Sequence, residues 1–199
     1  MKLALLRHGP TAWNAQGRIQ GWTDIPLSKE GLTQIRELLP PPSFETATAY
    51  ASPMQRARQT AEALGLIDPI LDPRLMEQNW GRWEGLSRAE ILALDGKDAF
   101  TRAGHGLEFR PPGGESTAEL HARVASFLKD VARAERDAIA VAHLGVLRAA
   151  YTLASGWDMR TPMPAELDVS KVLILDLARH GIPVIHSLNV ELPDRIEPV

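Results

Sequence analysis

The sequence contains no cysteine among its 199 residues. It therefore has no disulfide framework, no thiolate nucleophile and no cysteine-based zinc site. A chain without disulfides fits a reducing compartment, and we expect a cytoplasmic protein.

A strong excess of charge is also missing. Lys and Arg together number 22 and Asp and Glu 25, which gives a formal net charge of -3. The basic surface that nucleic acids require is absent, so we expect no nucleic-acid partner.

Long apolar runs are missing as well. No window approaches the roughly 18 uninterrupted apolar residues of a membrane span. Arg7 ends the first apolar run before a signal-peptide core of about 7–15 residues is complete. We expect a soluble protein with no membrane partner.

The sequence does contain enough apolar residues for a substantial core. Hydrophobic residues make up 44% of the chain, which is usual for globular proteins. The length favours one domain over residues 1–199. Gly104, Gly106 and the run 111–114 interrupt the later pattern, and we interpret residues 86–115 as an insertion or cap segment over the sheet, where substrate selection is often built.

Apolar strand patterns alternate with helical patterns, which predicts a layered α/β domain with a largely parallel sheet. We expect strands at residues 2–6, 46–51 and 138–142, and a terminal hairpin formed by 172–177 and 183–185. We expect helices from Ser28 to Pro40, from Ser52 with Pro53 in its first turn to Gly65, and over 145–156. Capping boxes are predicted at Ser87 with Glu90 and at Ser116 with Glu119.

Basic residues follow three of these predicted strands. Arg7 and His8 stand where the first strand ends, and His143 follows the strand at 138–142. Arg56 lies one turn into the helix after the second strand. Ligands of open α/β sheets bind outside the carboxyl ends of the strands, so these side chains are expected to form one positive, anion-binding site.

Several sequence blocks jointly resemble the histidine phosphatase superfamily, the phosphoglycerate-mutase-like proteins. They occur in family order and span about three quarters of the chain: Leu6 to Asn14 with Arg18 and Gln20-Gly21, Ser52 to Glu62, Leu75-Met76-Glu77 with Gly81 to Gly85, Pro112 to Ser116, and His143 to Arg148. Arg179-His180-Gly181 repeats the first tripeptide without a companion motif, and we assign it a structural role in the hairpin turn. The resemblance implies a three-layer α/β/α sandwich around a mostly parallel sheet with a C-terminal antiparallel hairpin.

The resemblance also implies roles for individual residues. His8 would attack phosphorus and become a phosphohistidine, Glu77 would protonate the leaving oxygen, and Glu84 is the alternative proton donor. The phosphate would be bound by Arg7, Arg56 and a protonated His143, with further substrate contacts from Asn14, Thr11, Gln20, Gly21 and Leu144. These cations balance the phosphate, so neither a metal nor another cofactor is expected.

The third block favours the phosphatase branch, which includes alpha-ribazole phosphatase and broad-specificity phosphatases. Mutases of the family carry Arg after the catalytic Glu, whereas this chain has Gln78. We therefore expect a metal-independent phosphomonoesterase for a small phosphorylated metabolite. Mutase-type phosphoryl transfer and a non-catalytic phospho-ligand or protein-binding module are the alternatives. The substrate and the oligomeric state stay open, with a homodimer as one option.

Overall fold

The computed structural model describes residues 1–195, and its centre is one sheet of six strands. The spatial order is β3-β2-β4-β1-β5-β6. The strands are β1 (Lys2–Arg7), β2 (Thr48–Ala51), β3 (Ile70–Leu71), β4 (Ala138–Ala142), β5 (Val172–Leu177) and β6 (Pro183–Val190). The first four run parallel, whereas β5 is antiparallel to β1 and β6 is antiparallel to β5.

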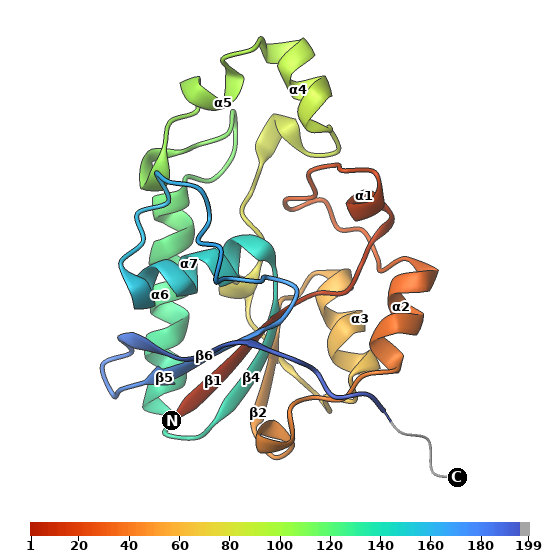
Figure 1. The fold of residues 1–199 in the computed structure, drawn as a ribbon, viewed down its shortest axis with the longest axis vertical. Coiled ribbons are helices and arrows are strands. Elements are labelled where there is room, and N and C mark those ends of the chain that lie inside the picture. The colour runs from red at the N-terminus through yellow and green to blue at the C-terminus, as the bar shows by residue number, and fades with distance from the viewer. Residues whose placement is uncertain (196–199) are drawn as a thin grey trace.

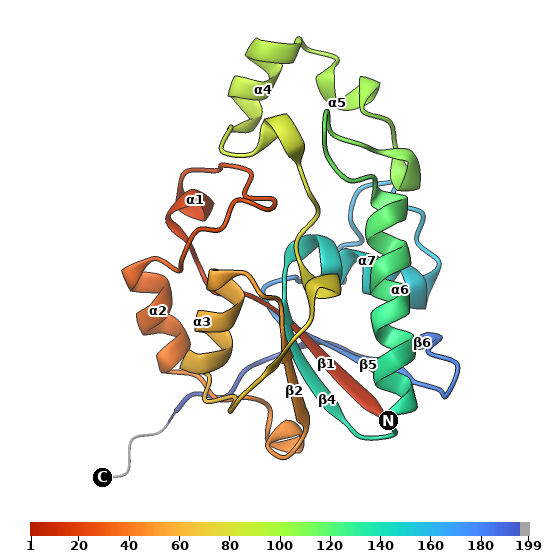
Figure 2. The same cartoon turned by 180° about the vertical axis from the view of Figure 1, so that it is seen from behind.

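Helices cover both faces of the sheet, as Figures 1 and 2 show from opposite sides. On one face lie α2 (Lys29–Arg36) and α3 (Gln55–Ala63), and on the other lie α6 (Thr117–Arg133) and α7 (Leu144–Ser155). The predicted three-layer α/β/α sandwich with a C-terminal antiparallel hairpin is confirmed.

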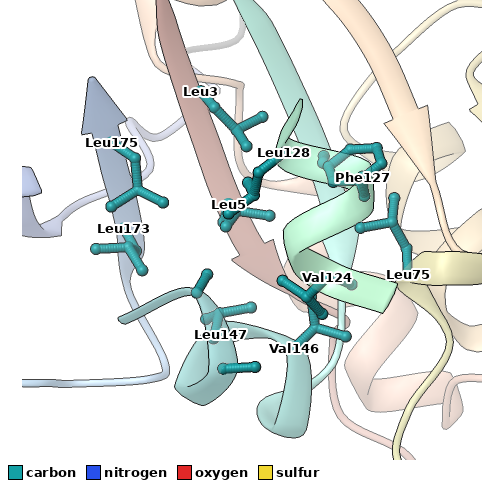
Figure 3. Close-up of a cluster of buried hydrophobic side chains, with 14 of the residues drawn as sticks. Leu3, Leu5, Leu75, Val124, Phe127, Leu128, Val146, Leu147, Leu173 and Leu175 are labelled. Atoms are coloured by element: carbon teal, nitrogen blue, oxygen red, sulfur yellow. The ribbon is translucent and has the colours of Figure 1, made fainter. Parts of the chain in front are cut away.

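The alternation of side chains along β1 explains the two cores. Leu3 and Leu5 pack with α6 and α7, whereas Ala4 and Leu6 pack with α2 and α3. Successive side chains of a strand point to opposite faces, so a strand that is buried on both sides is apolar throughout. Figure 3 shows Leu3 and Leu5 against Phe127 and Leu128 of α6.

A cap segment lies at one end of the molecule, beyond the carboxyl ends of the parallel strands (Figure 1). It contains α4 (Arg88–Asp95) and α5 (Ala99–Arg102), and it has its own apolar cluster around Trp83 and Ile91. The remaining short elements are α1 (Ala12–Ala15) and the 3-10 turns η1 (Pro42–Phe44), η2 (Pro73–Leu75), η3 (Gly81–Trp83) and η4 (Gly106–Glu108).

The predicted helix caps are confirmed at three of four positions. The side chains of Ser28, Ser87 and Ser116 accept hydrogen bonds from the amides three residues later. The prediction for Ser52 and Pro53 is wrong, because α3 begins at Gln55 and has no side-chain cap. The Ser52 hydroxyl lies instead against His143.

The remaining differences concern element ends. The helix after Ser28 ends at Arg36 rather than at the prolines, and β6 continues to Val190. The two-residue strand β3 was not predicted. Arg179-His180-Gly181 lies between β5 and β6, as expected. Within residues 1–195, no helix is long and apolar enough to cross a bilayer.

Candidate active site

The parallel strands bring distant parts of the chain to one edge of the sheet. Arg7 at the end of β1 pairs with Ala142 at the end of β4. Ala51 at the end of β2 pairs with Val141, so His8, Ser52 and His143 all follow immediately at that edge. A cavity of about 200 Å³ opens there, lined by Arg7, His8, Asn14, Arg18, Ile19, Gln20, Gly21, Arg56, Glu77, Trp80 and Leu144. We call it the phosphate cavity.

The hydrogen bonding of His8 fixes its tautomer. Its Nδ1 lies 2.7 Å from the carbonyl oxygen of Gly9. A carbonyl only accepts hydrogen bonds, so Nδ1 carries the proton and Nε2 keeps its lone pair. Burial, followed by the charges of Arg56 and Arg7, lowers the pKa of His8 to about 3. The side chain is therefore a neutral imidazole with a free nucleophilic nitrogen at neutral pH.

His143 lies behind His8 and is fully buried. Its Nδ1 accepts a hydrogen bond from Arg56 Nε at 3.3 Å, and its Nε2 lies 2.8 Å from Ser52 Oγ. Burial, together with the neighbouring His8 and Arg56, lowers the pKa of His143 well below its usual value. Without phosphate His143 is therefore neutral, because one ring nitrogen accepts from a guanidinium. The protonated His143 expected with a bound phosphate stays a prediction.

Arg56 is the most constrained cation of the site. It is fully buried, and it donates through Nη1 to the carbonyl of Thr23 and through Nη2 to the carbonyl of Gly21. Its Nε holds His143, as described above. Three of its five N–H groups are thus used for positioning, and two are left for a ligand.

Arg7 and Asn14 present donors that the protein does not use. Arg7 Nε is buried and has no hydrogen-bond partner among the described residues. The Oδ1 atom of Asn14 accepts from the amide and the hydroxyl of Thr11, both at 3.0 Å. The amide nitrogen of Asn14 therefore faces the cavity as a donor, and an anion would satisfy both groups.

Glu77 is the carboxylate that lines the phosphate cavity. Its Oε1 accepts from the amides of Gln78 at 2.8 Å and Gly145 at 3.0 Å. Its backbone carbonyl accepts from Trp22 Nε1 and from Arg123. The side chain is therefore held at one edge of the cavity, close to the arginines.

Glu84, the alternative proton donor, has a different environment. Its carboxylate accepts four hydrogen bonds, from the amides of Trp22, Thr23 and Trp80 and from the Thr23 hydroxyl. It does not line the cavity. This carboxylate fastens the loop at Trp22 to the segment at Trp80, and we assign it a structural role.

The structure brings most of the predicted site residues together, but not all. Of the ten, eight line the phosphate cavity, whereas His143 lies behind it and Thr11 caps α1 and orients Asn14. Gln20 lines the cavity with a buried Oε1 that has no partner among the described residues.

Sequence reasoning left Arg18 out of the site, although it lines the phosphate cavity. Arg18 belongs to the first sequence block, and this membership is the signal that could have identified it. It donates to the carbonyl of Gly85 and pairs with Glu90 at 2.9 Å, so it also ties the cap segment to the site. Trp80, three residues after Glu77, lines the cavity as well.

The chain is similar to several known proteins. The family model "Histidine phosphatase superfamily (branch 1)" matches residues 3–191. Phosphoserine phosphatase 1 of Hydrogenobacter thermophilus is 33% identical over 168 residues, covering 80% of this chain and 78% of that protein. The 2,3-bisphosphoglycerate-dependent phosphoglycerate mutase of Methylobacterium radiotolerans is 31% identical, covering 95% of this chain and 90% of that protein.

Among solved structures, the chain is similar to a mycobacterial glucosyl-3-phosphoglycerate phosphatase in complex with VO3. The two superpose with a TM-score of 0.77 at 27% identity, covering 96% of this chain and 99% of the other.

Proposed function

The chain belongs to branch 1 of the histidine phosphatase superfamily, and from its site we propose that it is a metal-independent phosphomonoesterase that acts through a phosphohistidine. The observation that carries the proposal is the tautomer of His8. Its Nδ1–H bond to the Gly9 carbonyl leaves Nε2 unprotonated in a cavity whose lining includes three arginines.

In the first step, Nε2 of His8 attacks the phosphorus of the monoester. The bond between nitrogen and phosphorus forms while the ester P–O bond breaks. The leaving oxygen takes a proton from the carboxyl group of Glu77. The Gly9 carbonyl stabilises the positive charge that develops on the imidazole ring.

In the second step, water attacks the phosphohistidine. Glu77, now a carboxylate, takes a proton from the water as its oxygen bonds to phosphorus. The nitrogen–phosphorus bond breaks, so inorganic phosphate is released and His8 returns to its neutral tautomer.

The charge of the phosphoryl group is met by protein donors. The free N–H groups of Arg7 and Arg56 and the amide of Asn14 surround the cavity, and charge-assisted hydrogen bonds of this kind are the strongest that side chains make. They support phosphoryl transfer that depends on electrostatic stabilisation by fixed donors.

The position after Glu77 favours hydrolysis over a mutase reaction. Gln78 is buried, and its amide donates to the carbonyl of Glu115 at 3.0 Å. A mutase of this family is expected to use an arginine here for the substrate carboxylate. Gln78 supplies no cation and turns toward Glu115 instead.

The test is the hydrolysis of an aryl phosphate with and without EDTA. Wild type is expected to be active and insensitive to the chelator, and His8→Ala is expected to be inactive. His180→Ala is a matched control, since His180 stands in the second Arg-His-Gly tripeptide, exposed in the turn before β6. Activity that survives in His8→Ala, or is lost with EDTA, contradicts the proposal.

A further inference from the structure

A second, larger cavity adjoins the phosphate cavity beneath the cap segment. Its volume is about 430 Å³, and most of its lining residues come from the cap segment, α6 and α7. Those used below are Trp80, Arg88, Phe100, Phe109, Gly145 and Arg148. Trp80 lines both cavities. Gly145, whose amide holds Glu77, lies in the wall of the second one. We call it the leaving-group cavity.

The position of Glu77 explains this name. The proposed proton donor acts on the leaving oxygen of the substrate, so the rest of the leaving group must extend away from the arginines past Glu77. The leaving-group cavity begins on that side, at Trp80 and Gly145. Cavities of roughly 300–1,000 Å³ hold ligands of considerable size, so this one accommodates more than a few carbon atoms.

Aromatic side chains make up one part of its wall. Trp80 and Phe109 are in contact, with ring centroids 5.5 Å apart. Phe100 lies beside them and carries the guanidinium of Arg88 over its ring at 4.2 Å. Such a wall suits an apolar or flat body, because aromatic rings offer a large contact area of fixed geometry.

Positive charge makes up the other part. Arg88 and Arg148 line the cavity, and none of its lining residues is acidic. Arg148 is half-buried, and its Nε is completely buried without a hydrogen-bond partner among the described residues. Its guanidinium contacts the ring of Trp157 at 5.4 Å.

Among the described residues, Arg7 and Arg148 are the two arginines with a buried guanidinium nitrogen that has no hydrogen-bond partner. Arg123 of the adjacent helix is also half-buried, but it pairs with Glu115 and donates to the carbonyls of Arg74, Met76 and Glu77. Burying a charged donor without an acceptor costs free energy. Burial lowers the pKa of Arg148, and the charge of Glu77 only partly opposes this. Oε1 of Glu77 is already held by the amides of Gln78 and Gly145.

We propose that the leaving-group cavity binds the organic part of a phosphate monoester that combines an apolar, flat body with an acidic group, and that Arg148 binds this acidic group. The proposal rests on the proposed phosphatase activity of the adjoining cavity. Arg148 is then a specificity-determining residue of α7, five positions after His143.

The test compares two substrates of the same shape, 4-carboxyphenyl phosphate and 4-carbamoylphenyl phosphate. The first carries a carboxylate and the second its neutral amide. For wild type, Arg148→Lys and Arg148→Met, kcat/KM is measured for both substrates and the carboxylate-to-amide ratio is calculated. The difference in intrinsic reactivity between the two phosphates is the same for every enzyme, so it does not affect the comparison of these ratios. Arg36→Met is the control, because Arg36 is an exposed arginine of α2 outside both cavities.

The carboxylate-to-amide ratio is expected to be at least about tenfold higher in wild type and Arg36→Met than in Arg148→Met. Arg148→Lys is expected to lie between them, because it keeps the charge but loses the planar fork. Equal ratios in wild type and Arg148→Met overturn the proposal.

Binding of the products separates this inference from the proposed function. By calorimetry, 4-hydroxybenzoate is expected to bind wild type at least about tenfold more tightly than Arg148→Met, and 4-hydroxybenzamide is expected to show no such difference. If no phosphate is hydrolysed but this difference is seen, the phosphatase proposal fails and the cavity assignment stands. If hydrolysis proceeds without any dependence on Arg148 in either measurement, the phosphatase proposal stands and the cavity assignment fails.

Discussion

The amide of Gly145, in the first turn of α7, donates a 3.0 Å hydrogen bond to Oε1 of Glu77. The two residues are 68 positions apart in the chain. A Cβ atom at position 145 would overlap Oε1 of Glu77. The carboxylate therefore depends on the absence of a side chain at this point of the helix.

Gly145→Ala is expected to lower kcat by about 100-fold, the usual effect of moving a reacting group by about 1 Å. Folding should be little affected, because position 145 is helical and its φ angle is not positive. The control is Gly156→Ala at the end of the same helix, where φ is +76° and no atom is near. That variant is expected to lose roughly 1 kcal/mol of stability and to keep its kcat. Steady-state kinetics and thermal unfolding of both variants check this contrast.

Glu77→Gln is expected to slow the hydrolysis of alkyl phosphates by about 10²–10⁴-fold, because their leaving oxygens need a proton. For 4-nitrophenyl phosphate the loss should be smaller, since nitrophenolate departs without one. Rates measured over a series of leaving groups check this. A loss that is equal for all leaving groups would show that Glu77 is not the proton donor.

Glu84→Gln is the control for Glu77→Gln, and it is expected to affect the stability of the protein rather than catalysis. Its carboxylate accepts hydrogen bonds from the amides of Trp22, Thr23 and Trp80. The side-chain NH2 group of a glutamine at this position would face these N–H groups and could not accept from them. We expect a loss of roughly 1–3 kcal/mol in the free energy of unfolding, with the leaving-group dependence of the rate unchanged. Denaturant titration and the same series of substrates measure both effects.

Arg7→Met is expected to abolish phosphate binding without destabilising the protein. Burial lowers the pKa of Arg7, and its Nε has no partner among the described residues, so an apolar side chain of similar length removes an unpaired donor. Inorganic phosphate at tenfold its Kd should add about 1.4 kcal/mol to the stability of wild type. A similar rise in Tm for Arg7→Met would contradict the assignment.

The depressed pKa of His8, about 3, makes stability depend on pH. An unfolded histidine titrates near 6.5, so between about pH 6.5 and 3 the unfolded chain binds a proton that the native site excludes. Stability therefore falls as the pH drops through this window, by up to about 1.4 kcal/mol per pH unit for this residue. Between pH 6.5 and 5.5, the free energy of unfolding measured by denaturant titration should fall less for His8→Gln than for wild type. An equal loss would place the native pKa of His8 near its ordinary value.

The order of strands and helices follows from the sequence because most elements carry local signals. The buried run at 138–142 and the capping boxes at Ser87 and Ser116 depend only on neighbouring residues. Ser52 shows the limit of such signals. It has the residue type of a helix cap, but its hydroxyl lies 2.8 Å from His143, 91 positions away, and this tertiary contact decides its role.

The site divides in the same way. Residues at or directly after strand ends, such as Arg7, His8 and His143, could be predicted because strand ends converge at one edge. The role of Arg148 could not, since its surroundings depend on how the cap segment packs over α7. Thr11 was expected to contact the substrate, but its hydroxyl donates to Oδ1 of Asn14 and does not line the cavity.

The pairing of β1 with β4 also affects how activity appears during folding. The amide of Lys2 bonds to Asp137, 135 positions away, so the pairing closes a very long loop, which is slow to form. His8 reaches its neighbours only after this closure, whereas helices such as α6 form from local contacts. In a refolding experiment, the circular dichroism signal of the helices is therefore expected to recover before catalytic activity. The interval between the two recoveries measures how long β1 and β4 take to pair.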